Sequence, residues 1–155
     1  MSPPIHVAAG VVVRDGRLLL TQRDPGRSDY GHLWECPGGK VEPLDMSLVP
    51  PGDGYRAALA RELREELRVT ATVAEWLADA DVRRGDGSPA VVHFFVARLS
   101  ADQRPVPVDA IGLGWFSWHE VASLAMAPAN VQVRSLLLSR LPFAESALRV
   151  GRAPR

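Results

Sequence analysis

The stretch that decides the fold is residues 37–67, which read PGGKVEPLDMSLVPPGDGYRAALARELREEL. Its second half predicts a helix over residues 55–68, because leucines recur there at every fourth position and form one apolar face. Glu62, Glu65 and Glu66 stand three and four residues apart, so on a helix their carboxylates converge on a neighbouring face. The sequence therefore predicts a helix with one packed side and one acidic side.

The acidic side favours a bound divalent cation. Carboxylates on one helix face repel one another by about 0.2–0.5 kcal/mol per pair, and a cation relieves that repulsion. Ligands that offer only oxygen favour Mg²⁺ or Mn²⁺ over zinc. For an isolated Arg-Glu-x-x-Glu-Glu pattern, a solvated helix face neutralised by neighbouring arginines is an equally good interpretation.

Two glycines that precede the helix favour the metal site over the solvated helix face. Gly38 and Gly39 stand where the backbone can approach a phosphate or expose a carbonyl to a metal. Together with the acidic helix they resemble the Nudix box, the signature of the Nudix hydrolases: glycine, five residues, glutamate, seven residues, then Arg-Glu-apolar-x-Glu-Glu-x-Gly-apolar. The matching residues are Gly39, Arg61, Glu62, Leu63, Glu65, Glu66 and Val69.

Two departures from this motif bear on the site. An apparent insertion of eight residues, 44–51, separates the halves of the box, and removing it brings Asp53 to the position of the first glutamate. Asp53 keeps the negative charge, and an N-cap of the helix is the alternative role for it. Arg68 stands where the motif has a glycine that ends the helix in the left-handed conformation, so we expect a different helix exit with the acidic face intact.

The resemblance extends to the MutT-type branch of the family and covers most of the chain. Residues 33–42, LWECPGGKVE, are similar to a run typical of that branch, with Cys36 in place of phenylalanine. Residues 127–130, Ala-Pro-Ala-Asn, resemble the segment with which 8-oxo-dGTP pyrophosphatases read the oxidised purine through an asparagine. That asparagine is Asn130 here, and an N-cap of the last helix is its alternative role.

Three further residues are candidates for the site. Arg23 matches a basic position that contacts the nucleotide in the MutT-type branch, and a surface arginine is the alternative. Trp34 offers an aromatic face on which a base can stack. Asp109 precedes Trp115 by six residues, as an acid that joins the metal site does in that branch, and a loop-capping aspartate is the alternative.

The resemblance implies a division of roles at the site. Glu62, Glu65 and Glu66 would be metal ligands, with the carbonyl of Gly39 and the carboxylate of Asp109 as further ligands. Arg61 would orient these carboxylates through a bidentate ion pair. The general base would be Glu62, Asp53 or Asp109. The implied cofactor is Mg²⁺ or Mn²⁺, which neutralises the phosphates and helps to deprotonate water.

Length and composition agree with one domain. The chain has 155 residues, 18 basic and 18 acidic side chains, and a single cysteine, which excludes an internal disulfide framework. We expect an α+β fold, a Nudix-type α/β/α sandwich with a mixed β-sheet, over residues 1–150, and a flexible tail at 151–155. The apolar run at residues 7–13 is too short to span a bilayer, which favours a cytoplasmic protein that does not bind membranes.

The expected function is Mg²⁺-dependent hydrolysis of a nucleoside triphosphate, with oxidised dGTP as one candidate, to the nucleoside monophosphate and pyrophosphate. A nucleoside diphosphate sugar is an alternative substrate, and a nucleotide-binding domain with little or no turnover is an alternative function. Because basic and acidic side chains are equal in number, the sequence argues against a protein that binds DNA or RNA in general. The sequence is compatible with a monomer and with a homodimer.

Overall fold

The computed structural model describes residues 2–26, 29–47, 50 and 53–143. The expected tail at 151–155 and part of the expected insertion at 44–51 lie outside these residues. In chain order the elements are β1 (Ile5–Val11), β2 (Val13–Arg14), β3 (Arg17–Gln22), β4 (Trp34–Glu35), β5 (Gly38–Lys40), α1 (Pro43–Ser47), α2 (Gly54–Leu67), β6 (Ala71–Arg83), β7 (Pro89–Leu99), β8 (Gly112–Phe116), α3 (Trp118–Ser123), α4 (Pro128–Gln132) and α5 (Arg134–Ser139).

Two four-stranded sheets form the centre of the molecule. The first has the order β5-β1-β7-β6, in which β1 and β7 are parallel and the other pairs are antiparallel. The second is built on β3, which pairs with β2, β4 and β8. Because neighbouring residues of a strand point to opposite faces, Ala9 and Val11 enter one hydrophobic core while Ala8 and Val12 enter another. The prediction of one α+β domain with a mixed sheet is confirmed.

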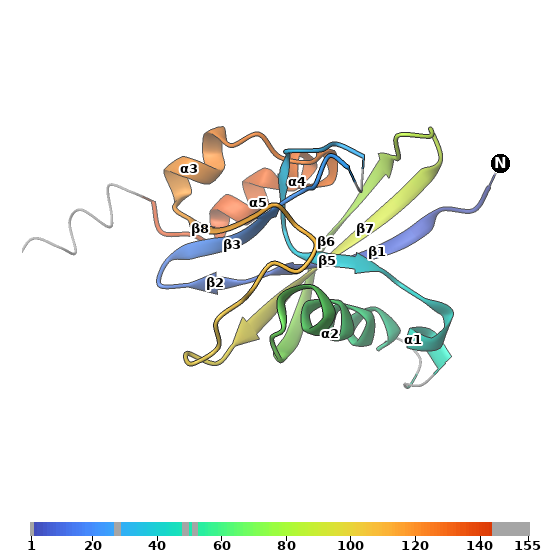
Figure 1. Cartoon of the computed structure of the whole chain (residues 1–155), viewed down its shortest axis with the longest axis horizontal. Coiled ribbons are helices and arrows are strands. Elements are labelled where there is room, and N and C mark those ends of the chain that lie inside the picture. Colours follow the sequence, from blue (N-terminus) through green and yellow to red (C-terminus); the bar gives the residue numbers. More distant parts are fainter. Residues whose placement is uncertain (1, 27–28, 48–49, 51–52, 144–155) are drawn as a thin grey trace, which may run out of the picture.

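The helices cover the sheets from opposite sides, with α2 on one side and α3, α4 and α5 on the other (Figure 1). The leucines of α2 are buried in one core, and Val121 of α3 and Leu137 of α5 are buried in the other. This arrangement leaves the acidic side of α2 beside β5, so the glycines and the glutamates of the motif meet at the edge of the first sheet (Figure 1).

Aromatic stacking fixes the start of α2 on the first sheet. The ring of Tyr55 lies 4.2 Å from that of His93, nearly parallel to it. His93 in turn bonds to Asp79 at 2.8 Å and to His6 at 2.9 Å, so three strands are tied together beneath the helix. Because the helix is anchored at its first turn, its later turns have a defined position relative to β5.

The other end of α2 corrects one expectation. Arg68 adopts the left-handed conformation, with φ 56° and ψ 37°, and its N–H bonds to the carbonyl of Arg64. This is the exit that a glycine would provide, so the helix does not end differently as the sequence led us to expect. A non-glycine residue in this conformation costs about 1–2 kcal/mol, and the packing around the helix end must supply that energy.

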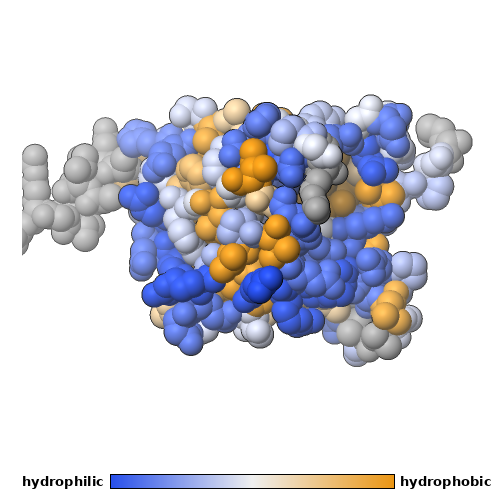
Figure 2. All heavy atoms as spheres, viewed as in Figure 1, coloured by the Kyte–Doolittle hydropathy of each residue, from blue (hydrophilic) through white to orange (hydrophobic). Residues whose placement is uncertain are grey.

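Figure 2 shows mainly hydrophilic residues on this face of the molecule, with apolar side chains gathered in a few patches near its centre. No helix in the described ranges is both long enough and apolar enough to cross a membrane.

Candidate active site

An acidic cavity of about 490 Å³ lies where the two halves of the motif meet. Gly38 and Gly39 line it from β5, Glu62 and Glu66 line it from successive turns of α2, and Asp109 lines it from the loop before β8. We call this space the acidic cavity. Of the five predicted metal-site residues, it brings together Gly39, two of the glutamates and Asp109.

The three glutamates of α2 do not share one environment. The side chain of Glu62 is only 11% exposed, whereas that of Glu65 is 59% exposed and pairs with Arg61 at 3.1 Å. Burial raises the pKa of Glu62, and the hydrogen bond from Arg61 opposes that shift. Glu62 and Glu66 therefore face the acidic cavity, while Glu65 lies outside its lining.

Glycine is required at both positions because neighbouring atoms lie too close to leave room for a side chain. A Cβ atom on Gly39 would overlap the carboxylate of Glu62, and a Cβ atom on Gly38 would overlap the backbone carbonyl of Ala8. The bend in β5 therefore packs directly against the acidic face of α2. Any larger residue at Gly39 would displace the buried carboxylate.

Arg61 is the hub that holds the carboxylates in place. Its Nε and Nη2 atoms donate to the two oxygens of Asp45 at 2.9 and 2.8 Å, which is a bidentate ion pair. Its Nη1 atom donates to Glu62 at 2.9 Å and to Glu65 at 3.1 Å. The expected orienting role of Arg61 is therefore supported by geometry, but Asp45 is its bidentate partner.

Sequence reasoning missed Asp45. This residue is buried, it accepts a further hydrogen bond from the N–H of Glu42, and the guanidinium of Arg61 holds its pKa below the usual range. The available signal was the spacing from Gly39 to Asp45, which leaves the five intervening residues that the motif requires. On that alignment the eight extra residues follow Asp45, as residues 46–53.

The structure does not bring Asp53 to this cluster. Its side chain is 57% exposed at the start of α2 and lies 3.9 Å from Arg56. It is the N-cap residue of α2 by position, as the alternative role required, but its side chain makes no capping hydrogen bond. The negative charge that the motif calls for is present, but Asp45 supplies it.

The end of α2 positions Asp109. The N–H groups of Val106 and Val108 donate to the last carbonyls of the helix, those of Leu67 and Glu66, at 3.0 Å each. These carbonyls have no partner within the helix, so the loop satisfies them and is fixed in return. Asp109 follows directly and joins the lining of the acidic cavity.

The donors of the acidic cavity suit a hard divalent cation, because they are all oxygens. Within the described ranges, no three His, Cys, Asp or Glu side chains converge closely enough to hold an ion by themselves. Glu62, Glu66 and the carbonyl of Gly39 could thus supply part of a coordination shell, which phosphate oxygens and water would complete. Mg²⁺ is commonly bound in this way, by one or two carboxylates together with substrate phosphates.

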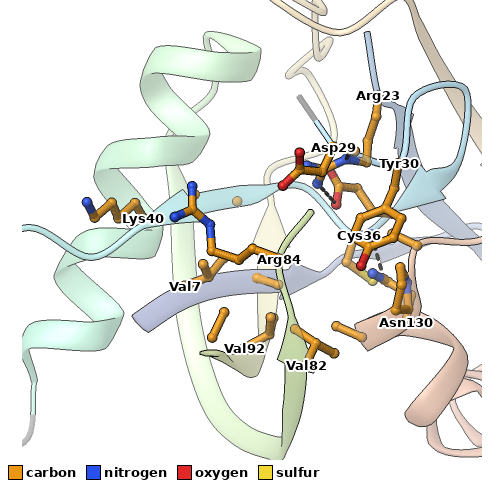
Figure 3. Close-up of a pocket in the computed structure, with 18 of the residues that line it drawn as sticks. Val7, Arg23, Asp29, Tyr30, Cys36, Lys40, Val82, Arg84, Val92 and Asn130 are labelled. Carbon is orange, nitrogen blue, oxygen red and sulfur yellow. Dashed lines mark hydrogen bonds and ion pairs between the residues drawn. The ribbon is translucent and has the colours of Figure 1, made fainter. Parts of the chain in front are cut away.

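A second cavity of about 370 Å³ adjoins the first. Its floor is apolar, with Val7 and Val92 from neighbouring strands and Val82 from β6 (Figure 3). We call it the nucleoside cavity, after the ligand that the resemblance to the Nudix hydrolases implies for it. The two cavities share five lining residues at their junction: Arg23, Glu35, Gly38, Gly39 and Lys40.

An ion pair marks the junction of the two cavities. The Nη1 atom of Arg23 donates to Glu35 at 2.6 Å, and its Nε atom donates to the carbonyl of Asp29 at 2.7 Å (Figure 3). Burial raises the pKa of Glu35, and Arg23 opposes that shift. Arg23 therefore takes up the predicted position beside the site. Glu35 was missed because an isolated glutamate in a strand carries no signal of its own.

Asn130 lines the nucleoside cavity from within α4. It is 3% exposed, and its Oδ1 atom accepts a hydrogen bond from the N–H of Cys36 at 2.8 Å. The N-cap of α4 is Ala127, so the alternative role of Asn130 as an N-cap is excluded. Because the carbonyl side of the amide is occupied, the amide nitrogen is the group left to meet a ligand as a donor.

Trp34 does not line either cavity. Its ring packs edge-on against Phe116 at 4.8 Å and contributes to the core beneath α4. Cys36 does line the nucleoside cavity, and burial raises the pKa of its thiol. The predicted stacking role of Trp34 therefore finds no support in its position.

The chain is similar in sequence to known proteins. Residues 4–137 match the NUDIX domain. The chain is 37% identical over 134 residues to the CTP pyrophosphohydrolase of Escherichia coli K12, covering 82% of this chain and 86% of that protein. It is 40% identical over 72 residues to the 8-oxo-dGTP diphosphatase of Haemophilus influenzae, covering 46% of each.

A solved structure extends the likeness to three dimensions. The crystal structure of a MutT NUDIX hydrolase from Burkholderia pseudomallei is similar with a TM-score of 0.67 at 26% sequence identity. The match covers 91% of this chain and 100% of that one.

Proposed function

The chain belongs to the NUDIX family, whose pyrophosphohydrolases cleave phosphoanhydride bonds of nucleotides, and we propose that it hydrolyses a nucleoside triphosphate to the nucleoside monophosphate and pyrophosphate. The observation that carries this proposal is the junction of the two cavities. One has an apolar floor and is of a size to accept a nucleoside, the other is acidic and rich in oxygen donors, and they meet at Gly38 and Gly39.

In the proposed hydrolysis, the residues of the acidic cavity have different roles. Nudix hydrolases use divalent metals, and a bound Mg²⁺ or Mn²⁺ would neutralise phosphate charge and acidify water. Glu62 and Glu66 would hold the cation with the carbonyl of Gly39, and Glu65 would act at the rim through Arg61. Arg61 would keep Glu62 from turning away, because it ties that carboxylate to Asp45.

The proton acceptor for the attacking water has to lie within reach of the phosphates. Glu62 and Asp109 both line the acidic cavity, which supports either of them as the general base. Asp53 lies outside the cavity and is not part of this proposal. Lys40 and Arg23, at the junction, would contact the phosphate chain between the nucleoside and the metal.

The base would be recognised from α4. Asn130 can donate to a carbonyl oxygen of the base, and both cytosine and 8-oxoguanine carry such an acceptor. These are the bases of the nucleotides that name two of the relatives, the CTP pyrophosphohydrolase and the 8-oxo-dGTP diphosphatase. We therefore propose a triphosphate of one of these bases as the substrate.

A product assay tests the proposed function. The protein is incubated with CTP, dCTP, dGTP, 8-oxo-dGTP and UDP-glucose, with Mg²⁺ or with EDTA, and the products are separated by ion-exchange chromatography. We expect monophosphate and pyrophosphate from at least one triphosphate, only with the metal. Release of orthophosphate, turnover of UDP-glucose alone, or binding of nucleotide without turnover would overturn the proposal.

A further inference from the structure

We propose that Tyr30 is a specificity-determining residue that closes the far end of the nucleoside cavity against bulky bases. This inference rests on the proposed function for the identity of the ligand, a nucleotide with its base in that cavity. It concerns the size of base that the enzyme accepts rather than the chemistry of hydrolysis.

A third cavity adjoins the nucleoside cavity. It measures about 350 Å³, close to the 370 Å³ of the nucleoside cavity itself. The two share a continuous floor and side wall, made by residues of β6, β7 and α4, and Tyr30 also lines both. The shared residues are Tyr30, Val82, Arg83, Ala90 and Pro128.

Tyr30 differs from the other shared residues because it comes from a loop instead of a strand or helix. Its ring extends from that loop toward β6, beside Cys36 and Asn130 (Figure 3). It is a large side chain placed where the floor of one cavity continues into the next. Tyr30, 40% exposed, therefore stands where the two cavities meet, and we call its ring the partition between them.

Three contacts hold this partition in place. The hydroxyl of Tyr30 donates to the carbonyl of Arg83 on β6 at 2.8 Å. The carboxylate of the preceding residue, Asp29, accepts from the N–H of Gly85 at 2.8 Å, and a Cβ atom on Gly85 would collide with it. The carbonyl of Asp29 accepts from Arg23. The loop is thus tied both to the hairpin of β6 and β7 and to the junction of the two main cavities.

The backbone of Tyr30 supports the same conclusion. Its φ of 59° lies in the left-handed region, which is unfavourable for a residue with a side chain. The contacts of its hydroxyl and of Asp29 hold it there. We therefore expect a base of ordinary size to fit in front of the ring, and a base with a large substituent on its outer edge to be stopped by it.

The test compares nucleotides that differ only in the bulk of the base. Paired probes are ATP with N6-benzyl-ATP, CTP with N4-benzyl-CTP, and dGTP with N2-benzyl-dGTP. For each pair, the ratio of kcat/KM for the benzylated to the plain nucleotide is measured in the parent protein and in Tyr30→Ala. We expect Tyr30→Ala to raise this ratio by about tenfold or more for at least one pair, since steric discrimination in an apolar pocket is of that order.

Two further variants separate the partition from a general loosening of the loop. Tyr30→Phe keeps the ring and loses only the hydroxyl, so its ratio should stay within about twofold of the parent, well inside the range that a pocket contact can produce. Gln132 lines the third cavity and not the nucleoside cavity, and its side chain reaches across to the carbonyl of Asp81 on β6, so Gln132→Phe added to Tyr30→Ala should fill the new space and lower the ratio again.

An unchanged ratio in a folded Tyr30→Ala protein would overturn the inference, as would an equal change in Tyr30→Phe. If Tyr30→Ala does not fold, Tyr30→Leu takes its place with the same expectation. If the parent hydrolyses none of the plain triphosphates, the proposed function fails separately. The same ratio, taken from dissociation constants by calorimetry, then tests Tyr30 without turnover.

Discussion

The acidic cavity and the nucleoside cavity lie side by side but are built in different ways. The acidic cavity takes most of its key residues from one continuous stretch, the bend at Gly38 and Gly39 and the helix α2. The nucleoside cavity is assembled from β1, β5, β6, β7, α4 and the loop before β4. The comparison teaches that the residues proposed for the reaction lie close together in the sequence, whereas those proposed to select the substrate are brought together only by the tertiary fold.

The two cavities also differ in the charges of the residues that line them. The acidic cavity is lined by five carboxylates, those of Asp24, Glu35, Glu62, Glu66 and Asp109, and by two cations, Arg23 and Lys40. The nucleoside cavity has the opposite balance, with the cations Arg23, Lys40, Arg83 and Arg84 and the carboxylates Asp29 and Glu35. On the proposed function, the negative charge of the first favours a bound cation, and the cations at the junction favour the phosphate chain of a nucleotide.

The largest expected effect comes from removing a charge in the acidic cavity. Glu66→Gln should lower kcat by about 10²- to 10³-fold, the scale seen when one element of transition-state charge stabilisation is lost. The fold should be intact, because the amide has the same shape. Steady-state kinetics at saturating Mg²⁺ measures the loss, and Glu75→Gln, which changes an exposed glutamate that lines neither cavity, is the matched control. Turnover within threefold of the parent would refute the assignment, because such a change lies far below about 10²-fold.

The next effect decides which aspartate serves Arg61. Asp45→Asn removes the charged bidentate partner, and we expect activity or metal affinity to fall by about 10- to 100-fold, as it does when residues that orient metal ligands are changed. Asp53→Asn should have a much smaller effect, since Asp53 is exposed. Activity titrated against Mg²⁺ measures both variants, and a larger loss in Asp53→Asn would restore the alignment that the sequence first favoured.

A variant in the nucleoside cavity should change selectivity rather than rate. Asn130→Asp keeps the acceptor for the N–H of Cys36 but loses the amide donors. We expect kcat/KM for a base that presents a carbonyl to fall by about tenfold relative to one that presents an amino group. Competition between CTP and ATP measures this ratio, because cytosine carries a ring carbonyl whereas adenine carries an amino group and no carbonyl. The Mg²⁺ dependence should not change, and a change in it without a change in base preference would contradict the division between the two cavities.

The pH dependence of stability reports on the Asp45–Arg61 pair. Because Arg61 lowers the pKa of Asp45 in the folded protein, the pair stabilises the fold above the ordinary pKa of aspartate, about 3.9. That stabilisation is lost as the pH falls through the lowered pKa. The difference in unfolding free energy between the parent and Asp45→Asn should be about 1.5–3 kcal/mol near neutral pH. It should shrink below about pH 4. Urea unfolding of the EDTA-treated proteins measures it, and a difference that grows on acidification would be the wrong sign.

The smallest expected effect lies at the end of α2. Arg68→Gly should stabilise the protein by up to about 1 kcal/mol, since glycine adopts the left-handed conformation without steric cost. Arg64→Gly, in the helix interior, is the contrasting control and should destabilise by about 1 kcal/mol. Thermal unfolding measures both, and a destabilised Arg68→Gly protein would show that the arginine side chain contributes more than its backbone strain costs.

The same contrast explains what the sequence could predict. The spacing of the leucines and glutamates in α2 predicted the helix and its acidic side, because both depend on local periodicity. Asp45 was missed because removing residues 44–51 as the insertion removed Asp45 with them. Trp34 suggested base stacking by its position next to the motif, but its packing against Phe116 depends on β8, which is far away in the sequence. Tyr30 gave no signal, since its role arises only where a loop meets β6.

The central claim is that a divalent cation binds between α2 and the glycine bend and holds the phosphates of the nucleotide there. The direct measurement is a crystal structure with Mn²⁺ and a non-hydrolysable triphosphate, with the metal located by its anomalous scattering. The account predicts an anomalous peak in the acidic cavity, coordinated by Glu62 or Glu66 and by a phosphate oxygen. A bound nucleotide whose Mn²⁺ contacts neither glutamate would contradict it.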